Sequence, residues 1–215
     1  MDIKNFVTTI RRDYSQKLFD EDSALENPFE QFEIWLSEAI AANVFEPNAM
    51  VLATATKDGK PTSRIVLLRG FDAEGFTFFT NYNSRKGKEI EENPQASLLF
   101  FWAEIERQVR IDGTASKASR EVSDSYFATR PRESQIGAWI SPQSEVIENR
   151  GVLEKKYAEA ARQWEGKVIR RPPDWGGFVV KPEIFEFWQG RESRLHDRLI
   201  YTRAETGWKI KRLAP

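Results

Sequence analysis

Three side chains that can carry positive charge alternate along a short stretch near the C-terminal end of the sequence. Arg194, His196 and Arg198 are separated by Leu195 and Asp197, and His196 is the only histidine among the 215 residues. In an extended strand, alternate side chains project from the same face, so the three cationic groups would lie together. Such a face suits a ligand that carries phosphate or carboxylate. The alternative is a solvated edge strand whose charges discourage aggregation.

Two further groups of residues have the chemistry of an anion site. Ser84-Arg85-Lys86 combines a hydroxyl and two cations with the start of a predicted helix, where free backbone N–H groups attract phosphate. An ordinary capped surface helix would show the same pattern. Tyr126 and Arg130 are four residues apart on a predicted helix end, and therefore on one face, and we expect Ser134 in the loop that follows. A phenol, a guanidinium and a hydroxyl together suit a phosphate ester.

Arginine also occurs in a strand that is otherwise apolar. Arg64 precedes Ile-Val-Leu-Leu, and Arg69 closes the strand predicted for Ser63–Arg69. An arginine in such a strand must reach solvent or meet an anion. Strict alternation places Arg64 and Arg69 on opposite faces. Both would serve one site only if the chain bends or two ligands lie side by side.

Composition excludes several classes of function. The 32 lysines and arginines nearly balance the 33 aspartates and glutamates, so no basic field favours nucleic acid or a membrane surface. The absence of cysteine excludes disulfides and thiolate chemistry, and a single histidine argues against a histidine-rich metal centre. The first nine residues have no signal-peptide core, and no stretch is long and apolar enough to span a membrane. We expect a cytoplasmic protein with no bound metal.

The elements that must position these residues are mostly short strands. A helix is predicted to begin after Asn27, with Pro28 in its first turn, and to run to Ile40. Lys57–Lys60 is a strong hairpin turn. Three other helices are predicted: a short one after Ser84, one capped by Ser119 that runs through Ala128, and one capped by Ser144 that runs from Glu145 to about Trp164. The predicted strands are Ala49–Thr56, Ser63–Arg69, Phe76–Asn81, Ala96–Trp102, Gln108–Ser116, Gly177–Lys181, Ile184–Trp188, Arg198–Arg203 and Trp208–Arg212.

This order of elements favours a mainly β fold with flanking helices, of the α+β class. Short strands joined by tight turns indicate an antiparallel barrel rather than a doubly wound sheet. We expect a flexible N-terminal segment over residues 1–25 and a single domain over residues 26–215. That length is sufficient to bury a substantial core.

Several motifs, in a fixed order, resemble those of the pyridoxamine 5′-phosphate oxidase family, from about Arg11 to Pro215. The segments that carry the resemblance are Arg64–Leu68, Phe79–Asn81, Ser84–Lys86, Glu106–Val109, Arg130–Trp139, Trp175–Phe178, Phe187–Gly190, Arg194–Arg198 and Trp208–Pro215. The resemblance implies a split β-barrel, a homodimer, and FMN bound at the subunit interface.

The resemblance also assigns residues to each ligand. FMN would contact Arg64, Ile65, Val66, Leu67, Leu68, Phe79, Thr80, Arg85, Lys86, Gln108, Gln143, Ser144, Trp188 and Arg198. The substrate phosphate would be held by Arg69, Tyr126, Arg130 and Ser134. Arg194 and His196 would lie over the pyridine ring as the catalytic pair, and the Arg11, Arg12 and Tyr14 patch would cover the bound substrate. Position 69 departs from the family, where lysine is common, and position 79 is phenylalanine where tyrosine is common.

The activity that the resemblance implies is oxidation of pyridoxamine or pyridoxine 5′-phosphate to pyridoxal 5′-phosphate. A hydride equivalent would pass from the C4′ carbon to FMN, and O2 would accept the electrons to give hydrogen peroxide. The amine substrate would also release ammonia. Two other functions remain open from the residues alone: a related split-barrel flavoenzyme with another small substrate, and a non-enzymatic barrel that binds a flavin, a vitamin phosphate or single-stranded nucleic acid.

Overall fold

The fold is described from a computed structural model that covers residues 18–215. The chain forms two compact units. The first unit comprises the described residues up to Pro47 together with Leu99–Ile111 and Ile184–Pro215, and the second comprises Asn48–Leu98 and Asp112–Glu183. Three strands contribute residues to both units: β5 (Gln95–Trp102), β6 (Arg107–Lys117) and β7 (Trp175–Gln189).

The first unit is built around α2 (Pro28–Ala41), which confirms the helix predicted after Asn27. The Asn27 side chain accepts a hydrogen bond from the backbone N–H of Phe29, and so satisfies one of the free donors of the first turn. One face of α2 is buried in the aromatic core: Phe32 packs 5.0 Å from Phe100, and Trp35 packs 5.2 Å from Phe187, between ring centroids.

Antiparallel strands complete the first unit. β7 pairs with β8 (Asp197–Arg203), and β8 pairs with β9 (Trp208–Arg212). Two short 3₁₀ helices also belong to it, η1 (Ala103–Ile105) and η2 (Glu192–Arg194). Phe19 is buried against Trp35 and Phe187, which ties the start of the described chain to this core.

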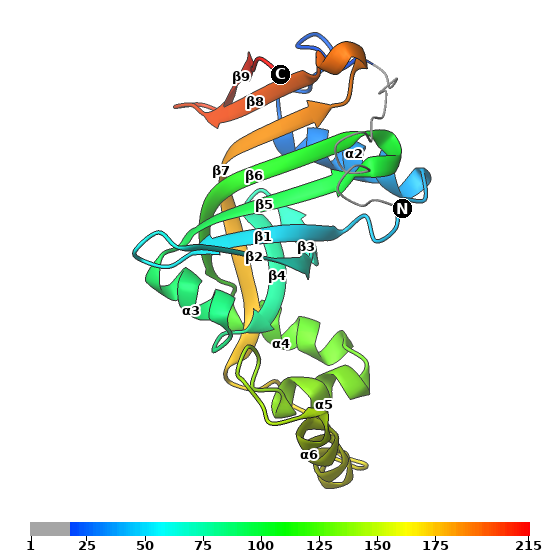
Figure 1. The fold of residues 1–215 in the computed structure, drawn as a ribbon, viewed down its shortest axis with the longest axis vertical. Helices are drawn as coiled ribbons and strands as arrows, with labels where there is room; N and C mark the ends of the chain where they lie inside the picture. The colour runs from blue at the N-terminus through cyan, green and yellow to red at the C-terminus, as the bar shows by residue number, and fades with distance from the viewer. Residues whose placement is uncertain (1–17) are drawn as a thin grey trace, which may run out of the picture. The chain divides into compact units, whose positions relative to one another are not determined.

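The second unit contains β1 (Ala49–Ala55), β2 (Pro61–Leu67), β3 (Gly70–Asp72) and β4 (Gly75–Asn81). Its strands follow the order β2-β1-β5-β6-β7-β4-β3, and the β1–β2, β3–β4 and β4–β7 pairs are antiparallel (Figure 1). The β1–β2 hairpin turns at the predicted position, where Gly59 adopts a φ of +82° that suits glycine. The antiparallel, mainly β class is therefore confirmed.

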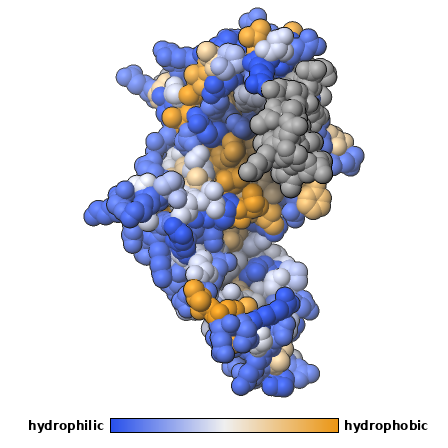
Figure 2. Space-filling view, in the orientation of Figure 1, coloured by the Kyte–Doolittle hydropathy of each residue, from blue (hydrophilic) through white to orange (hydrophobic). Residues whose placement is uncertain are grey.

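Four helices flank this sheet: α3 (Arg85–Glu92), α4 (Arg120–Thr129), α5 (Arg132–Ile140) and α6 (Arg150–Gln163). α5 and α6 lie side by side at one end of the second unit (Figure 1). Phe127, Ile136, Ala160, Ile169 and Trp175 form the apolar cluster beneath them. Hydrophilic side chains cover most of the visible surface around α6 (Figure 2). Within residues 18–215, no helix is long and apolar enough to cross a membrane.

Three predicted element boundaries are wrong. The strands predicted at 177–181 and 184–188 are one continuous strand, β7, which runs through Pro182. The helix predicted from Glu145 begins only at Arg150, because Ser144 has a φ of +74° that is incompatible with a helix N-cap, and Asn149 takes that position. Ser134 lies within α5 rather than in a loop, because Pro131 at the N-cap starts a new helix directly after α4.

The prediction of one extended face for Arg194, His196 and Arg198 is also wrong. Glu192–Arg194 forms η2, and Ser193 and Arg194 have φ values of +55° and +61°. β8 begins only at Asp197. Alternation therefore does not relate Arg194 to Arg198, because a left-handed turn lies between Gln189 and the next strand.

Candidate functional site

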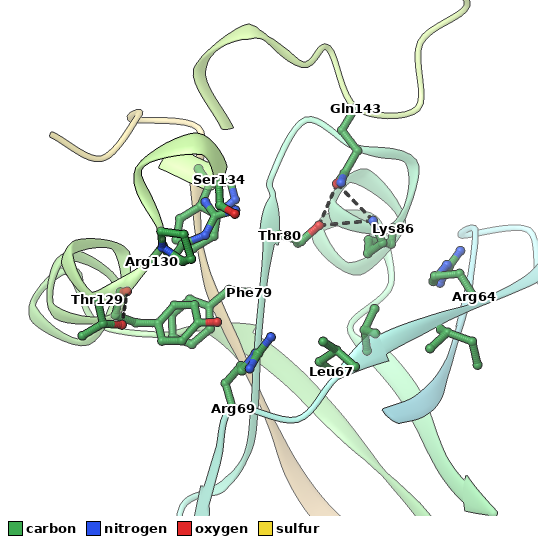
Figure 3. A pocket seen from close by; sticks show the side chains of 15 residues that line it. Arg64, Leu67, Arg69, Phe79, Thr80, Lys86, Thr129, Arg130, Ser134 and Gln143 are labelled. Atoms are coloured by element: carbon green, nitrogen blue, oxygen red, sulfur yellow. Dashed lines mark hydrogen bonds between the residues drawn. The ribbon is translucent and has the colours of Figure 1, made fainter. Parts of the chain in front are cut away.

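A cavity of about 710 Å³ lies within the second unit (Figure 3). None of the described residues that line it is acidic, whereas four are cationic. The lining residues are Arg64, Ile65, Val66, Leu67, Arg69, Phe79, Thr80, Lys86, Tyr126, Thr129, Arg130, Pro131, Ser134, Gln143 and Trp175. Twelve of these fifteen are residues that the sequence predicts for ligand binding, so the fold brings together strands β2 and β4 with helices α3, α4 and α5.

Arg64 and Arg69 line the same cavity, and the chain changes its strand partner between them. β2 ends at Leu67, and Leu68 turns into the core, where it is 6% exposed. The Arg69 backbone N–H then donates to the carbonyl of Thr77 on β4, 2.8 Å away. The Leu68 N–H still donates to the carbonyl of Asn48, next to β1, so the chain changes its pairing partner between Leu68 and Arg69. Both arginines line the cavity although they alternate in the strand.

One end of the cavity is formed by a fixed arginine. Arg64 Nη1 donates to the carbonyl of Leu52 (3.2 Å) and to Thr54 Oγ1 (2.6 Å), while Nη2 bonds Thr62 and Glu89. Glu89 Oε2 also accepts from the hydroxyls of Thr54 and Thr62, each at 2.5 Å. Burial alone would raise the pKa of Glu89, but these hydrogen bonds, with one from Arg85, hold the pKa at about 2. The ionised carboxylate therefore orients Arg64 from behind.

Lys86 lies beside this arginine. Its Nζ donates to Thr80 Oγ1 and to Gln143 Oε1, each at 3.1 Å, and Thr80 donates to the same Gln143 oxygen at 2.8 Å (Figure 3). Burial, and then the charge of Arg64, lower the pKa of Lys86 to about 8, against the opposing effect of Glu89. This end of the cavity combines two cations with hydroxyl and amide groups, which are the donors that a phosphate accepts from.

The opposite end contains the second group of cations. Arg130 and Ser134 lie on one side of the cavity in Figure 3, with Arg69 near them and Arg64 and Lys86 on the other side. Arg130 Nη1 is buried without a hydrogen-bond partner among residues 18–215. Burial, and to a smaller extent Arg69, lower the pKa of Arg130. A buried guanidinium nitrogen that lacks a hydrogen-bond partner indicates a place for an anion.

Stacked aromatic rings form the wall between the strands and α4. Phe79 lies 3.9 Å from Tyr126 and 5.6 Å from Trp175, with interplanar angles of 15° and 11°. The Arg69 guanidinium carbon lies 5.8 Å from the centre of the Tyr126 ring. Phe79 therefore packs in this wall, a contact that does not require the hydroxyl of a tyrosine.

Two predicted residues lie at a neighbouring cavity instead. Arg85 and Ser144 line a second cavity of about 340 Å³ in the same unit, to which Gln143 and Glu89 also contribute. Arg85 Nε donates to Glu89 Oε1 at 2.9 Å, so Glu89 joins the arginines of the two cavities. Leu68 lines neither of these cavities, because its side chain is buried in the core.

The remaining predicted residues belong to the first unit. Gln108 lies on β6 and Trp188 on β7, where the Trp188 ring is 4.7 Å from the ring of His196. His196 Nδ1 accepts a hydrogen bond from the backbone N–H of Arg191 at 3.1 Å. Burial, followed by the charges of Arg194 and Arg198, lowers the pKa of His196. The lowered pKa favours the neutral ring, and because Nδ1 accepts a hydrogen bond, the proton of the neutral ring is on Nε2.

Arg198 is held by a buried carboxylate, as Arg64 is in the second unit. Its Nε lies 2.8 Å from Glu186 Oε1, and its Nη1 donates to the carbonyl of Ala214 at 2.8 Å. Glu186 is 3% exposed and also pairs with Arg110 at 2.9 Å. Arg194 is exposed and is itself one of the two positive-φ residues of the turn. Arg11, Arg12 and Tyr14 lie outside the described residues.

The sequence analysis did not identify two residues that organise the cavity. Glu89 lies four residues after Arg85, and that spacing is a signal for an ion pair on one helix face. Trp175 begins one of the motifs that carry the family resemblance, yet no role was assigned to it. Its position against Arg130, with 4.5 Å from the guanidinium carbon to the ring centre, depends on tertiary packing alone.

Comparison with known proteins identifies the class. The family model described as pyridoxamine 5′-phosphate oxidase matches residues 36–164, and that of the pyridoxine 5′-phosphate oxidase C-terminal dimerisation region matches residues 175–215. The chain is 57% identical over 206 residues to the pyridoxine/pyridoxamine 5′-phosphate oxidase of Rubrobacter xylanophilus, which covers 96% of this chain and 95% of the relative. The relative of the same name from Nostoc punctiforme is 56% identical over 210 residues, or 97% and 98% of the two chains.

Solved structures agree with this class. PhzG from Burkholderia lata 383, in complex with tetrahydrophenazine-1-carboxylic acid, superposes with a TM-score of 0.87 at 35% identity, over 93% of this chain and 98% of that chain. A pyridoxamine 5′-phosphate oxidase-related, FMN-binding protein from Nostoc punctiforme gives a TM-score of 0.68 at 17% identity, over 86% and 97%, and indicates the fold alone. The fold is the antiparallel split barrel of flavin-binding proteins. The chain belongs to the pyridoxamine 5′-phosphate oxidase family.

Proposed function

We propose that the protein is an FMN-dependent oxidase that forms pyridoxal 5′-phosphate. Pyridoxine 5′-phosphate and O2 would give pyridoxal 5′-phosphate and hydrogen peroxide. Pyridoxamine 5′-phosphate, O2 and water would give the same two products and ammonia. The match to two models of the family and the relatives that share more than half of the sequence support this reaction.

The observation that carries the proposal is the charge pattern of the 710 Å³ cavity. It has cations at both ends and no acidic lining residue among residues 18–215, so it suits two phosphorylated ligands rather than one. The residues present fit FMN: Arg64 and Lys86 supply positive charge, and the apolar side chains between Arg64 and Leu68 offer a surface for a planar ring. The buried, unpartnered Nη1 of Arg130 fits a second phosphate.

The FMN-binding residues of the proposal are those that the family motifs assign. Those of the second unit are Arg64, Ile65, Val66, Leu67, Leu68, Phe79, Thr80, Arg85, Lys86, Gln143 and Ser144. The family motifs add Gln108, Trp188 and Arg198 in the first unit. We assign Leu68 a supporting role, because its buried side chain fixes the end of β2.

The substrate-binding residues of the proposal are Arg69, Tyr126, Arg130 and Ser134 for the phosphate, with Arg194 and His196 for the pyridine ring. Arg11, Arg12 and Tyr14 are proposed to cover the bound substrate. When bound, FMN supplies the group that accepts two electrons from the C4′ carbon. The protein holds the two reactants by their phosphates, which restricts their relative motion.

His196 is proposed to orient the substrate by donating a hydrogen bond. Its neutral ring presents Nε2–H, because Nδ1 already accepts from the Arg191 backbone. Arg194 would polarise the C4′ substituent. The C-terminal dimerisation region that the family model matches supports a homodimer, with FMN at its interface.

The test is reconstitution with FMN followed by turnover. We expect the purified protein to bind FMN with a flavin absorbance spectrum, and to release hydrogen peroxide and pyridoxal 5′-phosphate from either phosphorylated substrate. Pyridoxamine without its phosphate is the control substrate and should be oxidised at least about 100-fold less efficiently, because the charged contacts at Arg130 are lost. Arg130→Ala should retain FMN and raise the KM for pyridoxine 5′-phosphate.

Two results would refute the proposed function. One is a protein that binds no FMN under conditions in which it is folded. The other is an FMN-loaded protein that forms no pyridoxal 5′-phosphate from either substrate in the presence of O2.

A further inference from the structure

The guanidinium of Arg130 is held by aromatic rings and not by a carboxylate from the described residues. Its Cζ atom lies 4.5 Å from the centre of the Trp175 ring and 5.6 Å from that of Phe127. No ion pair joins Arg130 to any residue of the described chain, 18–215, and Nη1 has no hydrogen-bond partner there. The side chain is nevertheless half-buried at the C-terminal end of α4. Its position is therefore set by stacking.

The contrast with Arg64 shows what this arrangement achieves. Both terminal nitrogens of Arg64 donate hydrogen bonds, to Leu52, Thr54, Thr62 and Glu89. These bonds fix the orientation of the guanidinium, but they occupy its terminal N–H groups. A guanidinium that stacks on an indole face is also oriented, but its N–H groups lie in the plane of the guanidinium and remain available. Arg130 thus keeps its donors for an incoming anion.

Trp175 is itself rigidly held. It opens β7 and is 7% exposed. Its ring is within 6° of parallel to Tyr126 and within 11° of parallel to Phe79, and it meets Phe127 edge-on at 69°. The backbone carbonyl of Trp175 also accepts a hydrogen bond from Arg171. An indole that is packed on several sides can serve as a fixed platform for an arginine side chain.

We propose that Trp175 is a positioning residue for the substrate phosphate, and that it acts by stacking against Arg130 so that this guanidinium meets the phosphate with its donors free. The inference rests on the proposed function, since it assumes that Arg130 binds a phosphorylated substrate. It assigns to Trp175 a role in substrate affinity, and none in the oxidation step or in FMN binding.

A double-mutant cycle on the FMN-loaded enzyme tests this role. Trp175→Leu is expected to raise the KM for pyridoxine 5′-phosphate about tenfold, a change that corresponds to about 1.4 kcal/mol, while kcat stays within about twofold. Trp175→Phe keeps a ring face and is expected to raise the KM about threefold. In an Arg130→Ala background, both Trp175 substitutions should change the KM less than about twofold, because the side chain through which Trp175 acts is absent.

Direct binding separates this inference from the proposed function. The dissociation constants of pyridoxal 5′-phosphate and of inorganic phosphate are measured by calorimetry on the FMN-loaded protein, for wild type and each variant. We expect the Trp175 substitutions to weaken both ligands by the same factor as the KM. This measurement remains decisive even for a protein that binds FMN and shows no turnover, because it measures the affinity for the phosphate group and does not depend on the oxidation step.

Three outcomes would overturn the inference. Equal effects of Trp175→Leu with and without Arg130 would mean that the tryptophan acts by direct contact or by general support of the fold. An unchanged KM and phosphate affinity would mean that stacking does not position the arginine. A loss of FMN affinity as large as the loss of substrate affinity would mean that Trp175 does not act on the substrate phosphate alone. If Trp175→Leu does not fold, Trp175→Phe alone decides, because its effect must disappear without Arg130.

Discussion

The ammonium of Lys86 should make FMN binding dependent on pH. Its pKa is lowered to about 8, because burial disfavours the charged form and Arg64 of β2 repels it, while Glu89 of the same helix partly compensates. Thr80, Ser84 and Gln143 contribute only neutral acceptors. A lysine with a lowered pKa is cationic below that value and loses its charge above it. FMN affinity should therefore fall as the pH rises through 8.

The size of the effect follows from this pKa. Lys86 is about 90% protonated at pH 7 and about 10% protonated at pH 9. If only the cationic form binds the FMN phosphate, the dissociation constant should increase about tenfold between these two pH values. Bound phosphate would raise the pKa of Lys86 in turn, so the FMN complex should retain the proton to a higher pH than the apoprotein does.

The assay is a titration of the apoprotein with FMN between pH 6.5 and pH 9.5, in which binding is monitored by the quenching of flavin fluorescence. Lys86→Arg is the matched control, because a guanidinium remains charged throughout this range. Its dissociation constant should vary less than about threefold. Riboflavin, which lacks the phosphate, should show no dependence on Lys86. A tenfold increase in the FMN dissociation constant of the Lys86→Arg variant over the same pH range would refute the reasoning, because a group other than Lys86 would then control the titration.

Two further predictions concern stability. The pKa of Glu89 is held at about 2, below its ordinary value of 4.5, so its stabilising effect is fully present above pH 4.5 and is lost as the pH falls through 2. Glu89→Gln should lower the free energy of unfolding by about 3 kcal/mol at pH 7 and by much less at pH 2.5, as measured by urea denaturation; an equal loss at both pH values would contradict this. Asn27→Ala should lower the free energy of unfolding by about 1 kcal/mol through loss of the α2 cap, without change in FMN affinity, and an unaltered thermal midpoint would contradict it.

Local signals in the sequence were sufficient for most of the elements. The Asn27 cap and the proline after it determined the start of α2, and Ser84 determined the start of α3, because such caps satisfy backbone donors within a single turn. The hairpin at Lys57–Lys60 formed where a Gly was available for a positive φ. Tyr126 and Arg130, which the spacing placed on one helix face, both line the cavity, although Arg130 is the extended C-cap residue of α4 and not part of the helix.

The errors arose where tertiary contacts override local patterns. Alternation predicted one face for Arg194, His196 and Arg198, but two consecutive positive-φ residues, Ser193 and Arg194, form a turn instead. Neither residue is a glycine, and the sequence therefore contains no signal for that conformation. Pro182 suggested a break between strands, yet β7 continues through it.

The sequence thus determined which cations, hydroxyls and rings are present in the candidate site. It also determined on which helix or strand most of them lie. Their convergence was decided by the tertiary structure. Arg69 pairs with β4 and lines the cavity that Arg64 also lines, and the carboxylate of Glu89 fixes one arginine while the indole of Trp175 contacts another. Spacing along the chain does not encode these contacts, because they join residues that are distant in sequence and depend on how the sheet and the helices pack.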